Sequence, residues 1–139
     1  MATEFRIPIR QLSETASEAT MRTHRVIVDR PVTGGGTDTG PMGGELFLTA
    51  IGGCFMSNLL AAMRARESAV TNVRTEVIGT AEGTPPRFSS VDLIVTADTD
   101  DPAALAKLVE IADRGCIMMN TLRGKLEVKI SITEPCPPQ

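Results

Sequence analysis

The chain has 139 residues, enough for one domain with its own hydrophobic core, and its 14 Lys and Arg against 17 Asp and Glu give a net charge of −3. The absence of a basic run, together with the lack of Trp and Tyr, argues against nucleic acid as a partner. We therefore expect a single domain over residues 1–139, with a frayed, proline-rich tail at 133–139.

The compartment follows from the N-terminus and the cysteines. MATEFRIPIRQ carries charges and no apolar core of signal-peptide length, so we expect a cytoplasmic protein. The most apolar stretch, 46–63, is interrupted by Thr49, Ser57 and Asn58 and predicts a core helix rather than a membrane span. Three cysteines are too few for a secreted disulfide framework.

The spacing of the cysteines and the presence of a single histidine, His24, predict no metal site, and we expect no cofactor.

Two strands are predicted near the N-terminus. EFRIPIRQL, residues 4–12, alternates with the period of a strand, and its proline indicates a sheet edge. HRVIVDR, residues 24–30, is predicted as the second strand, and the polar segment 13–23 as a turn region or a loosely held hairpin. The glycine-rich segment 31–44 lacks the glycine spacing and the G-K-[ST] ending of nucleotide-binding loops, so it favours a mobile loop before a helix.

The rest of the chain alternates helices and strands. A long helix is predicted from about Glu45 to Arg66, and a second one opens at Asp101 and Pro102 and ends at Gly115. The remaining predicted elements are strands at 72–81, 87–98 and 125–133 and a short helical piece at 117–124. Strand pairs joined by short turns, with helices between them, predict an α+β fold with a largely antiparallel sheet.

The long helix carries Gly52 and Gly53 in its middle, directly before Cys54. Each glycine costs a helix interior about 1 kcal/mol relative to alanine, so the pair indicates a close approach of another backbone or a substrate. Cys54 is then either a small buried thiol at a helix crossing or a reactive thiol. Cys116 follows the helix-ending Gly115, where the chain can bring a second thiol toward the first, although spacing alone does not show that they meet.

A reactive thiol needs a nearby cation or a helix N-terminus. Cys54 lies about 13 Å along the helix from Glu45, too far for the helix's own N-terminal field. Arg25 is the preferred cation, with Arg10 and Arg22 as the next candidates. Glu45 lies on the opposite side of a straight helix from Cys54, so it reaches that thiol only from a partner subunit or through a bend.

The segments ELFLTAIGGC, which fits E-L-x-L-x-A-x-G-G-C, and ADRGCIMMNTLRGKLEV resemble the OsmC/Ohr superfamily of thiol-dependent hydroperoxide-handling proteins. The resemblance extends from about Val26 to Ile132. It implies an OsmC-like α+β fold, with antiparallel sheets around long central helices in an intertwined homodimer, and active sites at the subunit interface. It also implies that Cys54 is the peroxidatic and Cys116 the resolving cysteine, and that a dithiol such as a lipoylated protein is the reductant.

The sequence predicts a thiol peroxidase for organic hydroperoxides, with Cys54, Cys116, Glu45 and Arg25 as its site. Ile51 and Phe55, beside Cys54, are predicted to favour apolar peroxides. The alternative is a non-catalytic small-molecule-binding or redox-sensing protein, which is favoured by two departures from the family pattern, Gly44 in place of glutamate and Ile117 in place of proline, and by the lack of an aligned activating arginine. In a third interpretation both cysteines are core residues, and no role is expected for Cys136 in the tail.

Overall fold

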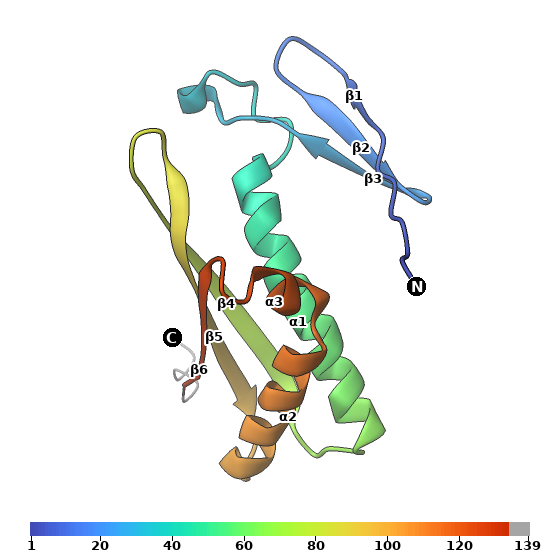
Figure 1. Cartoon of the computed structure of the whole chain (residues 1–139), viewed down its shortest axis with the longest axis vertical. Coiled ribbons are helices and arrows are strands. Elements are labelled where there is room, and N and C mark those ends of the chain that lie inside the picture. Colours follow the sequence, from blue (N-terminus) through green and yellow to red (C-terminus); the bar gives the residue numbers. More distant parts are fainter. Residues whose placement is uncertain (134–139) are drawn as a thin grey trace. The chain divides into compact units, whose positions relative to one another are not determined.

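The computed structural model describes residues 1–133 and contains two compact units, Met1–Phe47 and Leu48–Gln139. The boundary falls inside the long helix α1 (Gly43–Ala65). The single-domain prediction stays a prediction, and Cys136 lies outside the described residues. The α+β class is confirmed, since the chain forms two three-stranded sheets and long helices (Figure 1).

The N-terminal unit is an antiparallel sheet in the order β1 (Ile9–Gln11), β2 (Ser17–Met21) and β3 (His24–Val28). The predicted strand at 24–30 is confirmed as β3, whereas the predicted strand at 4–12 is reduced to three residues. The polar segment between them is not merely a turn, because it supplies β2, the central strand. Ala19 is the buried residue of β2, and Ala16, directly before the strand, is buried as well.

The glycine-rich loop after β3 is held by the buried carboxylate of Asp29, which is 2% exposed. One oxygen accepts hydrogen bonds from the hydroxyls of Thr37 (2.6 Å) and Thr39 (2.8 Å) and from the backbone N–H groups of the same two residues. The other accepts the backbone N–H of Arg30 at 2.7 Å. The Thr37 hydroxyl and the other donors hold the pKa of Asp29 far below its usual range despite burial. The loop predicted as mobile is therefore fastened to β3.

The second unit contains a sheet in the order β4 (Thr71–Glu82), β5 (Arg87–Asp98) and β6 (Glu127–Ile132). The β4–β5 hairpin is antiparallel, as predicted, but β5 and β6 are parallel, from Ser90 opposite Glu127 to Val95 opposite Ile132. Helices between β5 and β6 carry the chain back to the start of the sheet, which is the connection that a parallel pair requires. Alternate residues of β5 face the core: Val91, Leu93, Val95 and Ala97.

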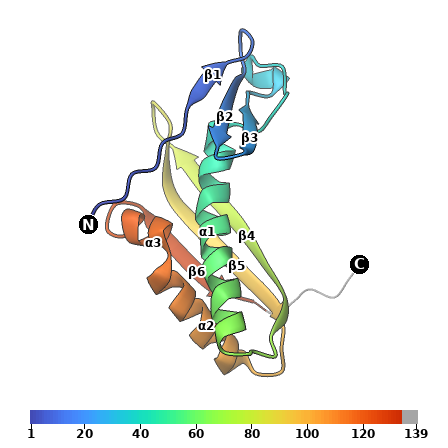
Figure 2. The same cartoon turned by 90° about the vertical axis from the view of Figure 1, so that its right-hand side faces the viewer.

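The helices of this unit pack on one face of the sheet (Figures 1 and 2). From α1, the buried residues are Ile51, Gly52, Phe55, Leu59 and Ala62. A Cβ at Gly52 would lie 2.5 Å from Cγ2 of Val77 on β4, so the glycine permits contact between helix and sheet. At Gly53 a Cβ would meet no atom within 4 Å. The close approach predicted from the glycine pair thus applies within the chain to Gly52 alone.

The length and composition of α1 would also suit a membrane span, a property that core helices of soluble proteins share. Its buried face against the sheet agrees with the predicted core helix.

Two further helices bring the second cysteine to the core. α2 (Pro102–Gly115) begins as predicted, with the Asp101 carboxylate accepting the backbone N–H of Ala104 at 3.1 Å. It buries Leu105, Leu108, Val109 and Ala112. Cys116 then breaks the helix with an extended backbone conformation and caps the short α3 (Ile117–Leu122). The predicted helical piece after Gly115 is confirmed, and Cys116 lies at the junction of α2 and α3.

Candidate functional site

The structure brings Cys54 and Cys116 together. The Cys116 thiol donates a hydrogen bond to the Cys54 sulphur, and the two Sγ atoms lie 3.1 Å apart. Cys54 comes from the middle of α1 and is half-buried, whereas Cys116 is fully buried at the α2–α3 junction. Both thiols are free. A disulfide bond is about 2.05 Å long, so a shift of about 1 Å would join the two sulphurs.

The two sulphurs have different surroundings. Burial raises the pKa of the Cys116 thiol, and its hydrogen bond and electrostatic interaction with Cys54 raise it further, whereas backbone N–H groups of Met119 and Met118 act in the opposite direction. Cys116 therefore stays a protonated donor at neutral pH. The Cys54 sulphur is the hydrogen-bond acceptor of the pair.

The raised pKa of Cys116 has a measurable effect on stability. A thiol whose pKa is higher in the folded than in the unfolded state stabilises the fold fully below the unfolded value, and this contribution is lost as the pH rises through the folded value. We expect the free energy of unfolding to fall above about pH 8.5, with a slope of up to about 1.4 kcal/mol per pH unit from this group. Urea unfolding of the wild type and of Cys116→Ser at pH 7–10 measures it. If the free energies of unfolding of the two proteins fell in parallel with pH, the Cys116 thiol would not be the cause of the loss.

Asn58 and Gly115 also belong to this site, and the sequence analysis gave neither of them a functional role. The Asn58 amide donates to the Cys54 carbonyl at 2.9 Å and lies 3.9 Å from the Cys54 sulphur. A Cβ at Gly115 would lie 3.2 Å from the Asn58 amide oxygen. The only signal in the sequence was spacing, because a residue four positions after Cys54 lies one helical turn away on the same face.

Glu45 and Arg25 lie in the N-terminal unit, so their predicted roles at the thiols stay predictions. Glu45 is in the first turn of α1, where its carboxylate accepts the backbone N–H of Met42 at 2.9 Å, half of a capping box. Arg25 is exposed on β3 opposite Thr20. Of the other predicted arginines, Arg10 forms an ion pair with Glu18 at 3.1 Å. Arg22 has a positive φ of 58° at the turn between β2 and β3.

Ile51 and Phe55 do not line an open pocket. Both side chains are 0% exposed, which assigns them to the core between α1 and the sheet. Neither side chain is therefore open to a substrate in this structure, and the predicted preference for apolar peroxides stays a prediction. Within residues 1–133, no group of three or more His, Cys, Asp or Glu side chains gathers to hold a metal ion. The chemistry that this arrangement supports is that of the two sulphurs.

The sequence of residues 35–131 matches the family of OsmC-like proteins. The chain belongs to this OsmC-like family. The match contains the motif ending in Cys54, both cysteines of the pair and Glu45, whereas Arg25 precedes it. OsmC-like proteins are typically soluble. No curated protein matches the sequence significantly.

Solved structures share the OsmC-like fold at low sequence identity. An OsmC-like protein from Mycoplasma pneumoniae has a TM-score of 0.82 at 15% identity, with 98% of this chain and 100% of that chain covered. A putative osmotic stress induced and detoxification response protein from Psychrobacter arcticus has a TM-score of 0.80 at 16% identity, covering 96% and 98%. An organic hydroperoxide resistance protein from Elizabethkingia anophelis has a TM-score of 0.72 at 20% identity, covering 97% and 100%. These likenesses establish the fold.

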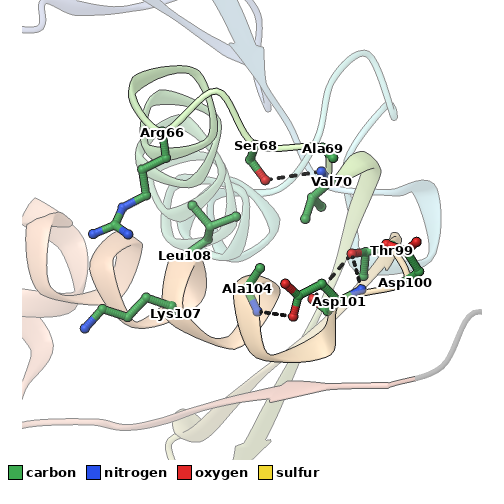
Figure 3. A pocket seen from close by; sticks show the side chains of 10 residues that line it. All are labelled: Arg66, Ser68, Ala69, Val70, Thr99, Asp100, Asp101, Ala104, Lys107 and Leu108. Atoms are coloured by element: carbon green, nitrogen blue, oxygen red, sulfur yellow. Dashed lines mark hydrogen bonds between the residues drawn. The ribbon is translucent and has the colours of Figure 1, made fainter.

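A cavity of about 330 Å³ lies away from the thiols, between the end of α1 and the start of α2. Figure 3 shows Arg66 and Lys107 on one side of it and Asp100 and Asp101 on the other, with Leu108 between them. Neither Cys54 nor Cys116 lines it. Since Arg66 follows Cys54 by twelve positions, about 18 Å along a helix, a molecule bound in this cavity would not reach the Cys54 sulphur.

Proposed function

We propose that this OsmC-like protein is a cysteine-based peroxidase that reduces organic hydroperoxides to alcohols. The observation that carries the proposal is the contact between Cys54 and Cys116, with Sγ atoms 3.1 Å apart. A half-buried sulphur that accepts a hydrogen bond from a buried thiol suits the attacking cysteine, and the protonated donor suits the resolving one.

The proposed catalytic cycle has three steps. The Cys54 thiolate attacks the terminal oxygen of a hydroperoxide, the O–O bond breaks, and the alkoxide that leaves takes a proton from water to become an alcohol. Cys54 is now a sulfenic acid. The Cys116 sulphur attacks the Cys54 sulphur and the Cys116 proton passes to the sulfenic oxygen. The S–O bond breaks, a disulfide forms, and the oxygen leaves as water. A dithiol then reduces the disulfide by thiol exchange and becomes a disulfide itself.

The substrate and the reductant are proposed by class. Solved structures with the same fold include organic hydroperoxide resistance proteins, and Ile117, directly after Cys116, is an apolar side chain that is 62% exposed. Both favour an organic hydroperoxide as the substrate. The reductant is proposed to be a small dithiol or a lipoylated protein, as the resemblance to the superfamily implies. Reduction by such a dithiol is consistent with a protein in the cytoplasm, where we propose that it acts.

The functional form is proposed to be a homodimer. On α1 the exposed residues Ala50, Gly53, Ser57 and Ala61 form a stripe of small side chains, which would let a second helix approach closely. A Cβ at Gly53 would have no close neighbour within its own chain, and contact with a second helix would explain the glycine there. In such a dimer Glu45 and Arg25 are proposed to serve the thiols, Arg25 as the cation beside the Cys54 thiolate.

Disulfide mapping tests the proposed function. The reduced protein is treated with one equivalent of cumene hydroperoxide, quenched with an alkylating reagent and digested. We expect a peptide pair joined through Cys54 and Cys116, formed within seconds, and slower oxidation with hydrogen peroxide. Two unmodified thiols after exposure to excess organic peroxide would rule out the peroxidase function.

Binding without turnover is the second candidate function, favoured by the cavity in Figure 3. Its volume of about 330 Å³ suits a small molecule, and charged groups of both signs flank an apolar floor. A protein of this kind would keep its thiols inert in the mapping experiment and would gain thermal stability with a ligand for this cavity.

A further inference from the structure

Asn58 is fixed beside the Cys54 sulphur by a bond to the backbone. It lies one turn after Cys54 on α1, and its Nδ2 donates to the Cys54 carbonyl at 2.9 Å. The same nitrogen lies within hydrogen-bond distance of the Cys54 sulphur, at 3.9 Å. An amide nitrogen carries two N–H groups, so one can hold the side chain on the helix while the other faces the sulphur.

The opposite end of this amide faces the segment that carries Cys116. A Cβ at Gly115 would come within 3.2 Å of the Asn58 Oδ1 atom. Gly115 is not among the glycines with a positive φ, so its backbone conformation does not require glycine. A side chain at position 115 would press on the Asn58 amide, whose oxygen would have to move by a few tenths of an ångström. One side chain on α1 therefore contacts its own cysteine and lies beside the residue directly before the other cysteine.

We propose that Asn58 is a positioning residue for the thiol pair, with two effects. Its N–H donor stabilises negative charge on the Cys54 sulphur, adding to the donor supplied by Cys116. Its contact with Gly115 sets the separation between α1 and the α2–α3 junction at which the two sulphurs meet. The effect on peroxide reduction rests on the proposed function, whereas the effect on Cys54 ionisation does not.

Two substitutions of similar size separate these effects from simple packing. Asn58→Leu removes both N–H groups, and Asn58→Asp replaces them with acceptors and adds a negative charge. The probe is iodoacetamide, which needs no peroxide, and alkylation is followed on the peptide that contains Cys54, because the chain has two other cysteines. We expect the pH at half-maximal alkylation to rise in both variants, more in Asn58→Asp, and the alkylation rate at pH 7 to fall by about three- to tenfold in Asn58→Leu.

Asn120→Leu is the matched control. Asn120 also donates its side-chain amide to a backbone carbonyl, that of Arg114 at 3.0 Å, but it is exposed on α3. We expect this variant to keep the wild-type alkylation profile. If Asn58→Leu does not fold, Asn58→Asp provides the same measurement, since it also lacks the N–H donor.

A second measurement follows the oxidation of each variant by cumene hydroperoxide and the closure of the Cys54–Cys116 disulfide. We expect slower disulfide closure in Asn58→Leu than in Asn120→Leu. Wild-type alkylation midpoints in the folded Asn58 variants would overturn the proposal. If the wild type itself does not react with peroxide but the Asn58 variants shift the alkylation midpoint, the proposed function fails while the positioning role of Asn58 is supported.

Discussion

Cys54→Ser is expected to abolish the consumption of organic hydroperoxides, lowering the rate with cumene hydroperoxide by at least about a hundredfold. A serine hydroxyl is not ionised at neutral pH and does not attack the O–O bond, whereas a cysteine thiolate does. The rate is measured by the disappearance of peroxide in the presence of excess dithiothreitol. Cys54 is half-buried and Ser is nearly isosteric, so the fold is expected to survive the change.

Cys116→Ser gives a different expected result. The first equivalent of peroxide is still consumed, and Cys54 then persists as a sulfenic acid that dimedone traps, because the buried thiol 3.1 Å away has been removed. Cys136→Ser is the control and is expected to keep the wild-type rate. Continued turnover of Cys54→Ser would assign the chemistry to another residue. A Cys116→Ser variant that yields no dimedone adduct after peroxide treatment would remove Cys54 from the attacking role.

Gly52→Leu and Gly53→Leu are expected to have opposite effects on the fold, although the two glycines are neighbours. At Gly52 the added Cβ alone would lie 2.5 Å from Cγ2 of Val77, so the helix must move off the sheet. We expect a loss of about 3 kcal/mol in the free energy of unfolding. At Gly53 nothing in the same chain lies within 4 Å of the added Cβ, so within one chain the change is expected to add about 0.5–1 kcal/mol through helix propensity.

Urea unfolding measures both free energies, and the double variant Gly52→Ala with Val77→Ala tests whether Val77 is the cause. We expect the two changes to cost less together than their sum, because Val77→Ala removes the methyl group that the new Cβ meets. Equal losses of unfolding free energy in monomeric Gly52→Leu and Gly53→Leu would contradict the explanation that Val77 restricts position 52 alone.

Sedimentation of Gly53→Leu also tests the proposed homodimer. A folded variant that has become monomeric supports the exposed face of α1 as the interface, and an unchanged dimer excludes it.

The elements with strong hydrophobic periodicity could be predicted from the sequence. The strands β4 and β5 and the start of α2 at its Asp101 cap follow from local signals, and the structure has them close to the predicted positions. β2 was missed because its residues are polar and its pairing partners, rather than its own pattern, make it a strand. The parallel pairing of β6 was missed because strand direction is set by the path of the intervening helices.

The candidate site was predictable in part. The glycine pair and the position after Gly115 drew attention to Cys54 and Cys116, but a separation of sixty-two residues carries no information about distance, and only the fold brings the sulphurs together. In the sequence Asn58 is only a polar interruption of an apolar helix. Its hydrogen bond to the Cys54 sulphur depends on the side-chain rotamer, which the sequence does not show. Ile51 and Phe55 are buried because the sheet covers their side of α1, and their spacing from Cys54 does not show which side that is.

Cys116 lies at a break between two helices rather than inside one, and for a thiol proposed to resolve the sulfenic acid this position affects resistance to oxidative damage. A cysteine at such a junction can shift toward its partner without unwinding a helix, and Cys116 already faces the Cys54 sulphur. In the proposed cycle the sulfenic acid is then short-lived, so a second peroxide seldom converts it into the irreversible sulfinic form. Such a protein suits the steady removal of a toxic compound better than signalling, which requires an oxidised form that persists long enough to be sensed.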